Sequence, residues 1–294
     1  MKIHLVDGTY ELFRSFYGPP PKRSPDGREV GATIGLLRSM LALISDSGVT
    51  HIACAFDHVI ESFRNDLFPG YKTGAGINPD LFAQFTLAEQ AVDALGIVVW
   101  PMVEFEADDA IATAAVRFQA ESGVDQIVIC SPDKDLAQLV SGSHIVCWDR
   151  RRDIVYDEAA VVAKYGVAPA SIPDWLALVG DSADGIPGIP TWGAKSAAAL
   201  LSRYQHIEAI PDDTSLWDMS AGRARRLAEN LANHRGEARL YLRLTTLRTD
   251  VPLEESLDDL AWYGAHEEFR KLCVELGASD LLDRVPRWIL GLYH

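Results

Sequence analysis

The chain has 294 residues, of which 48% are hydrophobic and 23% charged, a balance that excludes a largely disordered protein. Asp and Glu (42) outnumber Lys and Arg (27), and the net charge of −15 disfavours a nonspecific nucleic-acid binder unless its cations are grouped. No run reaches the roughly 20 apolar residues of a membrane span, and Asp7 interrupts any signal-peptide core, so we expect a cytoplasmic protein without a membrane segment.

The first half of the chain alternates short β-branched runs with longer helical patterns. This alternation predicts an α/β fold with a parallel sheet. The apolar spacing of three and four residues predicts helices over Gly31–Ile44, Pro79–Ala94 and Asp108–Ala120. The expected strands are Ile3–Val6, His51–Phe56, Ile97–Trp100, Gln126–Cys130 and His144–Trp148.

The second half shows no strand signal from about Pro169 onward, and short helices broken by Gly and Pro predict a helical subdomain. We therefore expect an α/β core over residues 1–167, with a mobile Gly-rich insertion at about 60–80, and a helical subdomain over residues 168–294. The four cysteines form no Cys-x-x-Cys pair, so we expect buried free thiols and not a zinc site or disulfides.

Acidic residues follow four successive predicted strands. One such residue is most often a helix cap or a turn residue, but seven at one edge of a sheet favour a ligand site. Carboxylates this close repel one another unless cations neutralise them, and an all-oxygen donor set favours Mg²⁺ or Mn²⁺. The seven are Asp7, Asp57, Glu106, Asp108, Asp109, Asp133 and Asp135.

Two further acids, Asp181 and Asp184, stand three residues apart and could face one point on a helical turn, although Asp181 could equally end a helix. Nine carboxylates without a Ser/His/Asp or Cys/His arrangement favour two-metal hydrolysis of a phosphodiester. A phosphatase with an aspartyl nucleophile is disfavoured, because Thr9 stands where such enzymes usually carry a second Asp.

Several motifs together resemble the 5′-nuclease or flap endonuclease family, which includes the 5′-3′ exonuclease domain of bacterial DNA polymerase I. The resemblance covers nearly the whole chain. Since the sequence stops at His294, we expect a stand-alone nuclease. The motifs are residues 5–8 (LVDG), 56–57 (FD), 63–64 (FR), 71–72 (YK), 106–109 (EADD), 133–140 (DKDLAQLV) and 180–188 (GDSADGIPG).

The resemblance implies a PIN-like parallel-sheet core with an appended helix-hairpin-helix subdomain at about residues 180–202. It implies two Mg²⁺ or Mn²⁺ ions, and K⁺ at the hairpin. The first ion would be held by Asp7, Asp57, Glu106, Asp108 and Asp109. The second would be surrounded, partly through water, by Asp133, Asp135, Asp181 and Asp184.

The resemblance also assigns basic and aromatic residues. Lys72 and Arg64 would act in catalysis, with Lys72 neutralising charge on the scissile phosphate. Phe13 would stack on a terminal base, and a place in the core is equally compatible with its sequence position. Further DNA contacts would come from Arg14, Tyr71, Gly188, Gly193 and Lys195.

Three differences from the family pattern stand out. Thr191 and Trp192 occupy positions where Gly and a small aliphatic residue are common, Pro132 replaces a usual Gly, and residues 73–77 lack the usual Arg or Lys. The run Arg150–Arg152 and the cluster of Arg223, Arg225 and Arg226 fit either extra duplex contacts or a solvated face.

The sequence thus predicts a 5′-3′ exonuclease or flap endonuclease that acts as a monomer on DNA with 5′ flaps, 5′ overhangs or single-strand/duplex junctions. The alternatives are a catalytically weak DNA-structure-binding protein and a ribonuclease of the same superfamily. The nine carboxylates disfavour the first alternative, and the hairpin disfavours the second.

Overall fold

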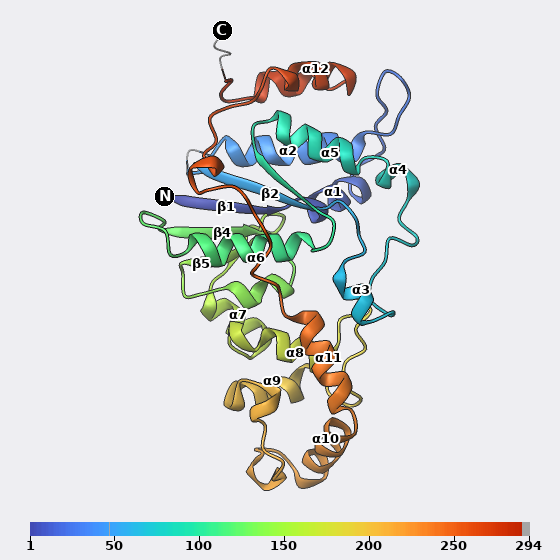
Figure 1. The fold of residues 1–294 in the computed structure, drawn as a ribbon, viewed down its shortest axis with the longest axis vertical. Helices are drawn as coiled ribbons and strands as arrows, with labels where there is room; N and C mark the ends of the chain where they lie inside the picture. Colours follow the sequence, from blue (N-terminus) through green and yellow to red (C-terminus); the bar gives the residue numbers. More distant parts are fainter. Residues whose placement is uncertain (47, 290–294) are drawn as a thin grey trace. The chain divides into compact units, whose positions relative to one another are not determined.

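The computed structural model describes residues 1–46 and 48–289 and divides into two compact units (Figure 1). Unit 1 comprises Met1–Ile60, Gly74–Ser131 and the described part of Thr249–His294. Unit 2 comprises Glu61–Thr73 and Pro132–Arg248. Both units are discontinuous in sequence, because Glu61–Thr73 packs with unit 2 and the described residues after Arg248 pack with unit 1.

Unit 1 is built on four parallel strands in the order β3-β2-β1-β4. The two inner strands, β1 and β2, are buried along almost their whole length, so their sequences are largely apolar, with His4 as the buried polar residue inside β1. All four coincide with predicted strands. Their bounds are β1 (Lys2–Asp7), β2 (His51–Asp57), β3 (Val98–Met102) and β4 (Gln126–Cys130).

Helices cover both faces of this sheet. Figure 1 shows α1 (Gly8–Tyr17), α2 (Gly31–Ile44) and α5 (Phe85–Ala94) over one face and α6 (Ala107–Phe118) under the other. Unit 1 also contains α4 (Pro79–Phe82) and α12 (Glu268–Glu275). The layered α/β architecture expected from the sequence is confirmed.

The expected helix Pro79–Ala94 is wrong as a single element, because it breaks between α4 and α5. The side-chain amide of Gln84 donates to the Asp80 carbonyl at 2.9 Å, while the Gln84 backbone N–H donates to Leu81 instead. The same buried side chain accepts from the backbone N–H of Thr33 on α2 at 3.0 Å. A side chain thus replaces the helical hydrogen bond at this point.

Unit 2 joins a short antiparallel hairpin, β5 (Ile145–Asp149) and β6 (Ile154–Tyr156), to a set of helices. Strand β6 was not expected from the sequence, because three residues are too few to show an alternating pattern. Beyond residue 169 the described residues form isolated β-bridges but no strand, as expected. The helices are α3 (Phe63–Leu67), α7 (Glu158–Tyr165), α8 (Ile172–Val179), α9 (Ala194–Tyr204), α10 (Ala221–Asn233) and α11 (Arg235–Thr245).

The core of unit 2 forms where α8 packs against α9 and α11. Leu176, Ala177 and Leu178 of α8 are fully buried there. All four cysteines of the chain are buried and free, as the sequence predicted. No helix among the described residues is long and apolar enough to cross a membrane.

Candidate active site

Five acids of unit 1 lie at the carboxyl edge of its sheet. Asp7 ends β1 and Asp57 ends β2, while the other three begin α6 directly after the loop that follows β3. Open parallel sheets bind ligands at this edge. Three of the five are buried and two are half-buried, and Asp109 has no exposed surface. The three acids on α6 are Glu106, Asp108 and Asp109.

Short hydrogen bonds hold the unit 1 acids in place. Asp7 caps α1 by accepting from the Tyr10 N–H at 2.8 Å, and its other oxygen accepts from the Ser131 hydroxyl at 2.9 Å. Asp57 accepts from the Ala107 N–H at the start of α6 at 2.7 Å. Asp7 therefore caps a helix, which is the commonest role of an Asp after a strand, and also lies at the edge where parallel sheets bind ligands.

Glu106 and Asp109 form a reciprocal pair at the start of α6. The Glu106 side chain accepts from the backbone of Asp109, and the Glu106 N–H donates to Asp109 Oδ2 at 3.1 Å. This capping box fixes both carboxylates relative to the helix axis. Four of the five acids of unit 1 thus accept from backbone amides at the start of α1 or α6, which orients their carboxylates.

Unit 2 brings three acids much closer together. One carboxylate oxygen from each of Asp135, Asp181 and Asp184 lies within 4.8 Å of the others, and this is the one such group of three within residues 1–46 and 48–289. Asp133 lies beside them, accepting from the Asp135 N–H at 2.9 Å. Buried carboxylates at this spacing fit a hard divalent cation such as Mg²⁺ or Mn²⁺, which takes oxygen ligands.

Electrostatic repulsion in this cluster is visible at Asp135. Burial, followed by the charges of Asp133, Asp184 and Asp181, raises the pKa of Asp135 well above its ordinary value. One of its oxygens, Oδ1, is buried without a hydrogen-bond partner. An unpaired buried carboxylate among other carboxylates is unfavourable unless a cation balances the charge, which is the arrangement expected of a metal ligand.

A tight turn positions the other two members of the cluster. The backbones of Asp181 and Ile186 exchange hydrogen bonds of 2.8 and 2.7 Å, which close a loop between α8 and the following hairpin. Gly185 in this loop has φ +74, and a Cβ there would lie 2.2 Å from the Gly70 carbonyl oxygen. Only glycine fits that close approach, so the loop is locked against the segment that carries Lys72.

Two lysines face the acids of unit 2. Lys72 Nζ lies 3.4 Å from Asp184 Oδ1, and its backbone N–H donates to the Asp184 carbonyl at 3.0 Å. Lys134 Nζ lies 2.6 Å from Asp181 Oδ2. Lys134 was not expected as a site residue, although its place between Asp133 and Asp135 is the sequence signal that could have found it.

Arg64, for which we expected a role in catalysis, is buried. Its side chain is 1% exposed, and its Nε donates to the Leu244 carbonyl at 2.8 Å, with Nη2 3.5 Å from the Thr246 carbonyl. The guanidinium also lies over the Phe63 ring. Arg64 therefore joins α3 to the end of α11 inside unit 2, because its long side chain satisfies carbonyls that the helix end leaves open.

The residues expected to contact DNA differ in how exposed they are. Tyr71 is buried, unlike its expected place on a DNA-binding surface. Phe13 is half-buried with its ring centroid 6.0 Å from that of Phe85, so its stacking on a terminal base stays a prediction. Arg14 is half-buried and bonded to Glu11 and Ser39 on the surface of unit 1.

Residues 188–195 lead into the N-terminus of α9. Gly193 is the N-cap of α9 and is exposed, with open space where a Cβ would stand, and Lys195 in the first turn is exposed too. Gly188 is buried at φ +72, and a Cβ there would lie only 2.5 Å from the Gly180 nitrogen, so this glycine serves chain packing. Helix N-termini bind anions readily, and this one is open to solvent.

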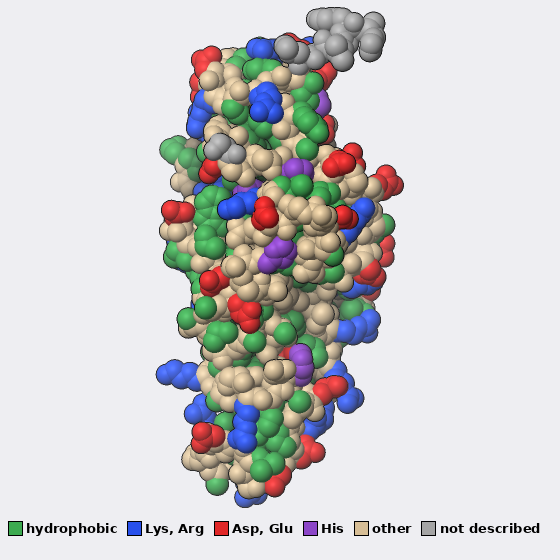
Figure 2. Space-filling view, turned by 90° about the vertical axis from the view of Figure 1, so that its left-hand side faces the viewer, with side chains coloured by type: hydrophobic (Ala, Val, Ile, Leu, Met, Phe, Trp, Pro, Cys, Tyr) green, Lys and Arg blue, Asp and Glu red, His purple; other side chains and the backbone are tan. Residues whose placement is uncertain are grey.

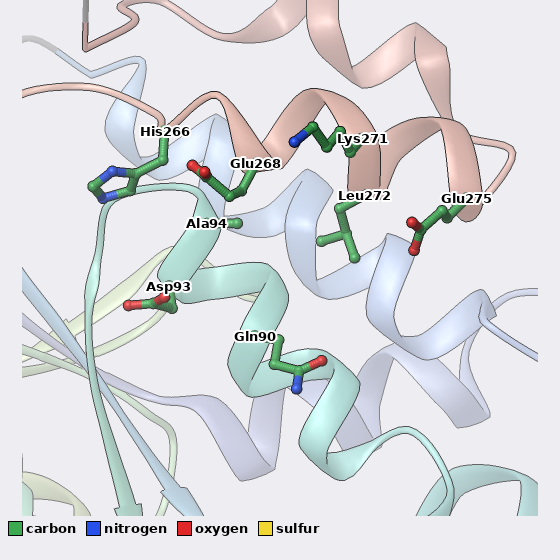
Figure 3. A pocket seen from close by; sticks show the side chains of 8 residues that line it. All are labelled: Gln90, Asp93, Ala94, His266, Glu268, Lys271, Leu272 and Glu275. Carbon is green, nitrogen blue, oxygen red and sulfur yellow. The ribbon is translucent and has the colours of Figure 1, made fainter. Parts of the chain in front are cut away.

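Unit 1 also has a groove away from these acids. It has a volume of about 480 Å³ and lies between α5 and α12, lined on one side by Gln90 and Asp93 and on the other by Lys271 and Glu275 (Figure 3). The C-terminal turn of α5 precedes β3, so the groove lies toward the amino edge of the sheet, away from the carboxyl edge that carries the acids. We assign it no catalytic role.

The chain matches two family models along most of its length. Residues 2–166 match the 5′-3′ exonuclease N-terminal resolvase-like domain, and residues 167–268 match the 5′-3′ exonuclease C-terminal SAM fold. The chain belongs to the 5′-3′ exonuclease family. The family expected from the sequence motifs is confirmed.

Two individual relatives support this family assignment. The chain is 33% identical over 259 residues to a 5′-3′ exonuclease of Aquifex aeolicus, covering 88% of this chain and 86% of that protein. It is 32% identical over 290 residues to DNA polymerase I of Bacillus caldotenax, covering 97% of this chain. The chain spans about a third of the length of that polymerase.

Solved structures share the fold. A complex of the phage T5 D15 flap endonuclease with DNA and metal ions superimposes with a TM-score of 0.67 at 18% identity, covering 97% of this chain and 99% of that one. Flap endonuclease-1 from Methanococcus jannaschii gives a TM-score of 0.55 at 14% identity, covering 96% and 90%. At these identities the likeness concerns the fold.

Proposed function

We propose that this chain is a divalent-metal-dependent 5′-3′ exonuclease and 5′ flap endonuclease that hydrolyses DNA phosphodiesters. The observation that carries the proposal is the cluster of carboxylate oxygens of Asp135, Asp181 and Asp184 within 4.8 Å. Lys72 and Lys134 lie against this cluster, so the chain supplies both anions for a cation and cations for a phosphate. The family and its named relatives support the reaction class.

The acids of the two units would hold two Mg²⁺ or Mn²⁺ ions, one set in each unit. Asp7, Asp57, Glu106, Asp108 and Asp109 form the first set, and Asp133, Asp135, Asp181 and Asp184 form the second. A bound divalent ion of this kind lowers the pKa of coordinated water and stabilises charge on a phosphate. The donor chemistry fits, since every candidate ligand is a carboxylate oxygen.

Lys72 would act on the substrate directly. Its side chain is about one-quarter exposed and is held beside Asp184 by both a side-chain contact and a backbone hydrogen bond. A positioned cation stabilises the negative charge that develops on the phosphate oxygens in the transition state. Lys134 would instead balance the charge of Asp181, with which it pairs.

Duplex DNA would lie on the hairpin and α9. Figure 2 shows Lys and Arg side chains projecting from the part of unit 2 that contains α9 and α10. Residues 195–248 contain nine Lys and Arg against six Asp and Glu, although the whole chain has a net charge of −15. Phosphates are attracted to such a local excess of cations. A K⁺ ion at the hairpin, action as a monomer and a cytoplasmic location, as expected from the sequence, belong to the same proposal.

Single-turnover cleavage of a 5′-labelled DNA flap tests the proposal. We expect cutting near the junction with Mg²⁺ or Mn²⁺, none with EDTA, and a loss of at least about 10³-fold in rate for Asp108→Ala at unchanged DNA affinity. Asp93→Ala, an exposed acid of the α5/α12 groove, is the matched control and should keep the wild-type rate.

Two outcomes would contradict the proposal. Binding of the flap without cutting in any metal would favour a DNA-structure-binding protein. Faster cutting of a matched RNA flap would favour a ribonuclease. Cleavage with and without K⁺ and light scattering of the free protein test the monovalent ion and the monomer.

A further inference from the structure

Thr191 adopts a backbone conformation that β-branched residues avoid. Its φ is +71, in the left-handed region that normally selects glycine. It occupies the third position of a turn closed by a 3.0 Å hydrogen bond from the Trp192 N–H to the Ile189 carbonyl, with Pro190 at the second position. A positive φ at the third position is the geometry of a type II turn. Such strain persists only where surrounding contacts impose it.

Helix α10 supplies those contacts. The Asn230 side-chain amide donates one hydrogen to Thr191 Oγ1 at 3.1 Å and the other to the Arg226 carbonyl at 3.0 Å. The next residue of the turn, Trp192, is 4% exposed and donates from its indole to the Leu227 carbonyl at 3.1 Å. Leu227 and Asn230 are three residues apart, so one face of α10 holds two consecutive turn residues.

The turn leads directly into the N-terminus of α9. Gly193 caps that helix without a side-chain hydrogen bond, and the N–H groups of Gly193, Ala194 and Lys195 have no acceptor among the described residues. Arg223, also on α10, donates to Ser196 Oγ at 2.7 Å, at the end of the same first turn. The direction of these amides therefore depends on the conformation of Thr191 and Trp192.

We propose that Asn230 is a positioning residue for DNA binding: its hydrogen bond to Thr191 keeps the turn in the left-handed conformation and so aims the first-turn amides of α9 at a duplex phosphate. The inference rests on the proposed function. It explains how this chain keeps a hairpin turn that would ordinarily need glycine. Where glycine adopts the conformation freely, no such hydrogen bond is required.

A double-variant cycle tests this role. Asn230→Leu removes the donor at similar volume and should weaken binding of a duplex-containing flap about tenfold, while the single-turnover rate at saturating enzyme changes less than twofold. Thr191→Gly should bind like wild type, because glycine needs no external support. Thr191→Gly combined with Asn230→Leu should also bind within about twofold of wild type. Asn233→Leu, an exposed amide on the same helix, is the matched control.

Cleavage of a fully single-stranded 5′ end provides a second readout, and Asn230→Leu should leave it unchanged. The inference is overturned if Asn230→Leu binds duplex flaps like wild type, if the double variant binds as weakly as Asn230→Leu, or if single-stranded cleavage falls equally. Failure of the proposed function looks different, since the wild-type protein itself would then not cut a flap in Mg²⁺.

Discussion

Lys134 Nζ lies 2.6 Å from Oδ2 of Asp181, so a lysine from the segment after β4 neutralises an acid from the loop after α8. Burial disfavours the charge on Lys134, but its hydrogen bond to Asp181 and the nearby charges of Asp135 and Asp133 outweigh that effect and raise the pKa of Lys134. The acid cluster of unit 2 therefore already contains an internal cation.

Lys134→Met should make the protein depend on divalent ions for stability. Without the ammonium group, the repulsion between Asp181 and its neighbours is unbalanced, and we expect Tm in EDTA to fall by about 3 °C, the shift of roughly 1 kcal/mol in a domain of this size. Mg²⁺ should remove most of that difference. Thermal melting in EDTA and in Mg²⁺, with Lys271→Met as control, measures this difference. An equal fall in Tm in EDTA and in Mg²⁺ would contradict the prediction.

Asp135→Asn should stabilise the metal-free protein at neutral pH. A carboxyl whose pKa is raised in the folded state binds its proton more tightly when folded, so its ionisation destabilises the fold as pH rises above the unfolded value. We expect a higher Tm for Asp135→Asn in EDTA near pH 7, converging on wild type below about pH 4, the ordinary aspartate pKa. In saturating Mg²⁺ we expect the wild type to have the higher Tm. Asp66→Asn, at an exposed position of unit 2, is the control.

Lys72→Ala should separate chemistry from binding. The ammonium group beside Asp184 acts on charge that develops in the transition state, so we expect the single-turnover rate to fall about 10²-fold or more and flap affinity to change less than threefold. Lys72→Arg should recover part of the rate. A large loss of affinity at an unchanged rate would show that Lys72 only holds the DNA.

Arg64→Met should lower the thermal stability of the protein. A buried guanidinium that donates to backbone carbonyls contributes about 1.5–3 kcal/mol per charged hydrogen bond, so we expect Tm to fall by several degrees. Well below that Tm, the cleavage rate should stay within about threefold of wild type. If Tm is unchanged and the rate falls 100-fold, the role in catalysis expected from the sequence would be right.

The inner strands and the acids at their ends could be predicted from local patterns. β1 and β2 are buried on both faces, so both are largely apolar in sequence, and Asp7 and Asp57 end them at the carboxyl edge. The break between α4 and α5 could not be predicted, because it depends on the Gln84 side chain meeting Thr33, 51 residues away.

The sequence by itself determined the family, the layered α/β core and the nine candidate carboxylates, since these depend on motifs and periodicities along a continuous stretch of chain. Only the tertiary structure decided that Asp135, Asp181 and Asp184 share one cluster and that Lys134 pairs within it. Only the structure showed that Arg64 is buried and that Asn230 supports Thr191. These contacts join residues far apart in sequence, and packing of whole elements selects them.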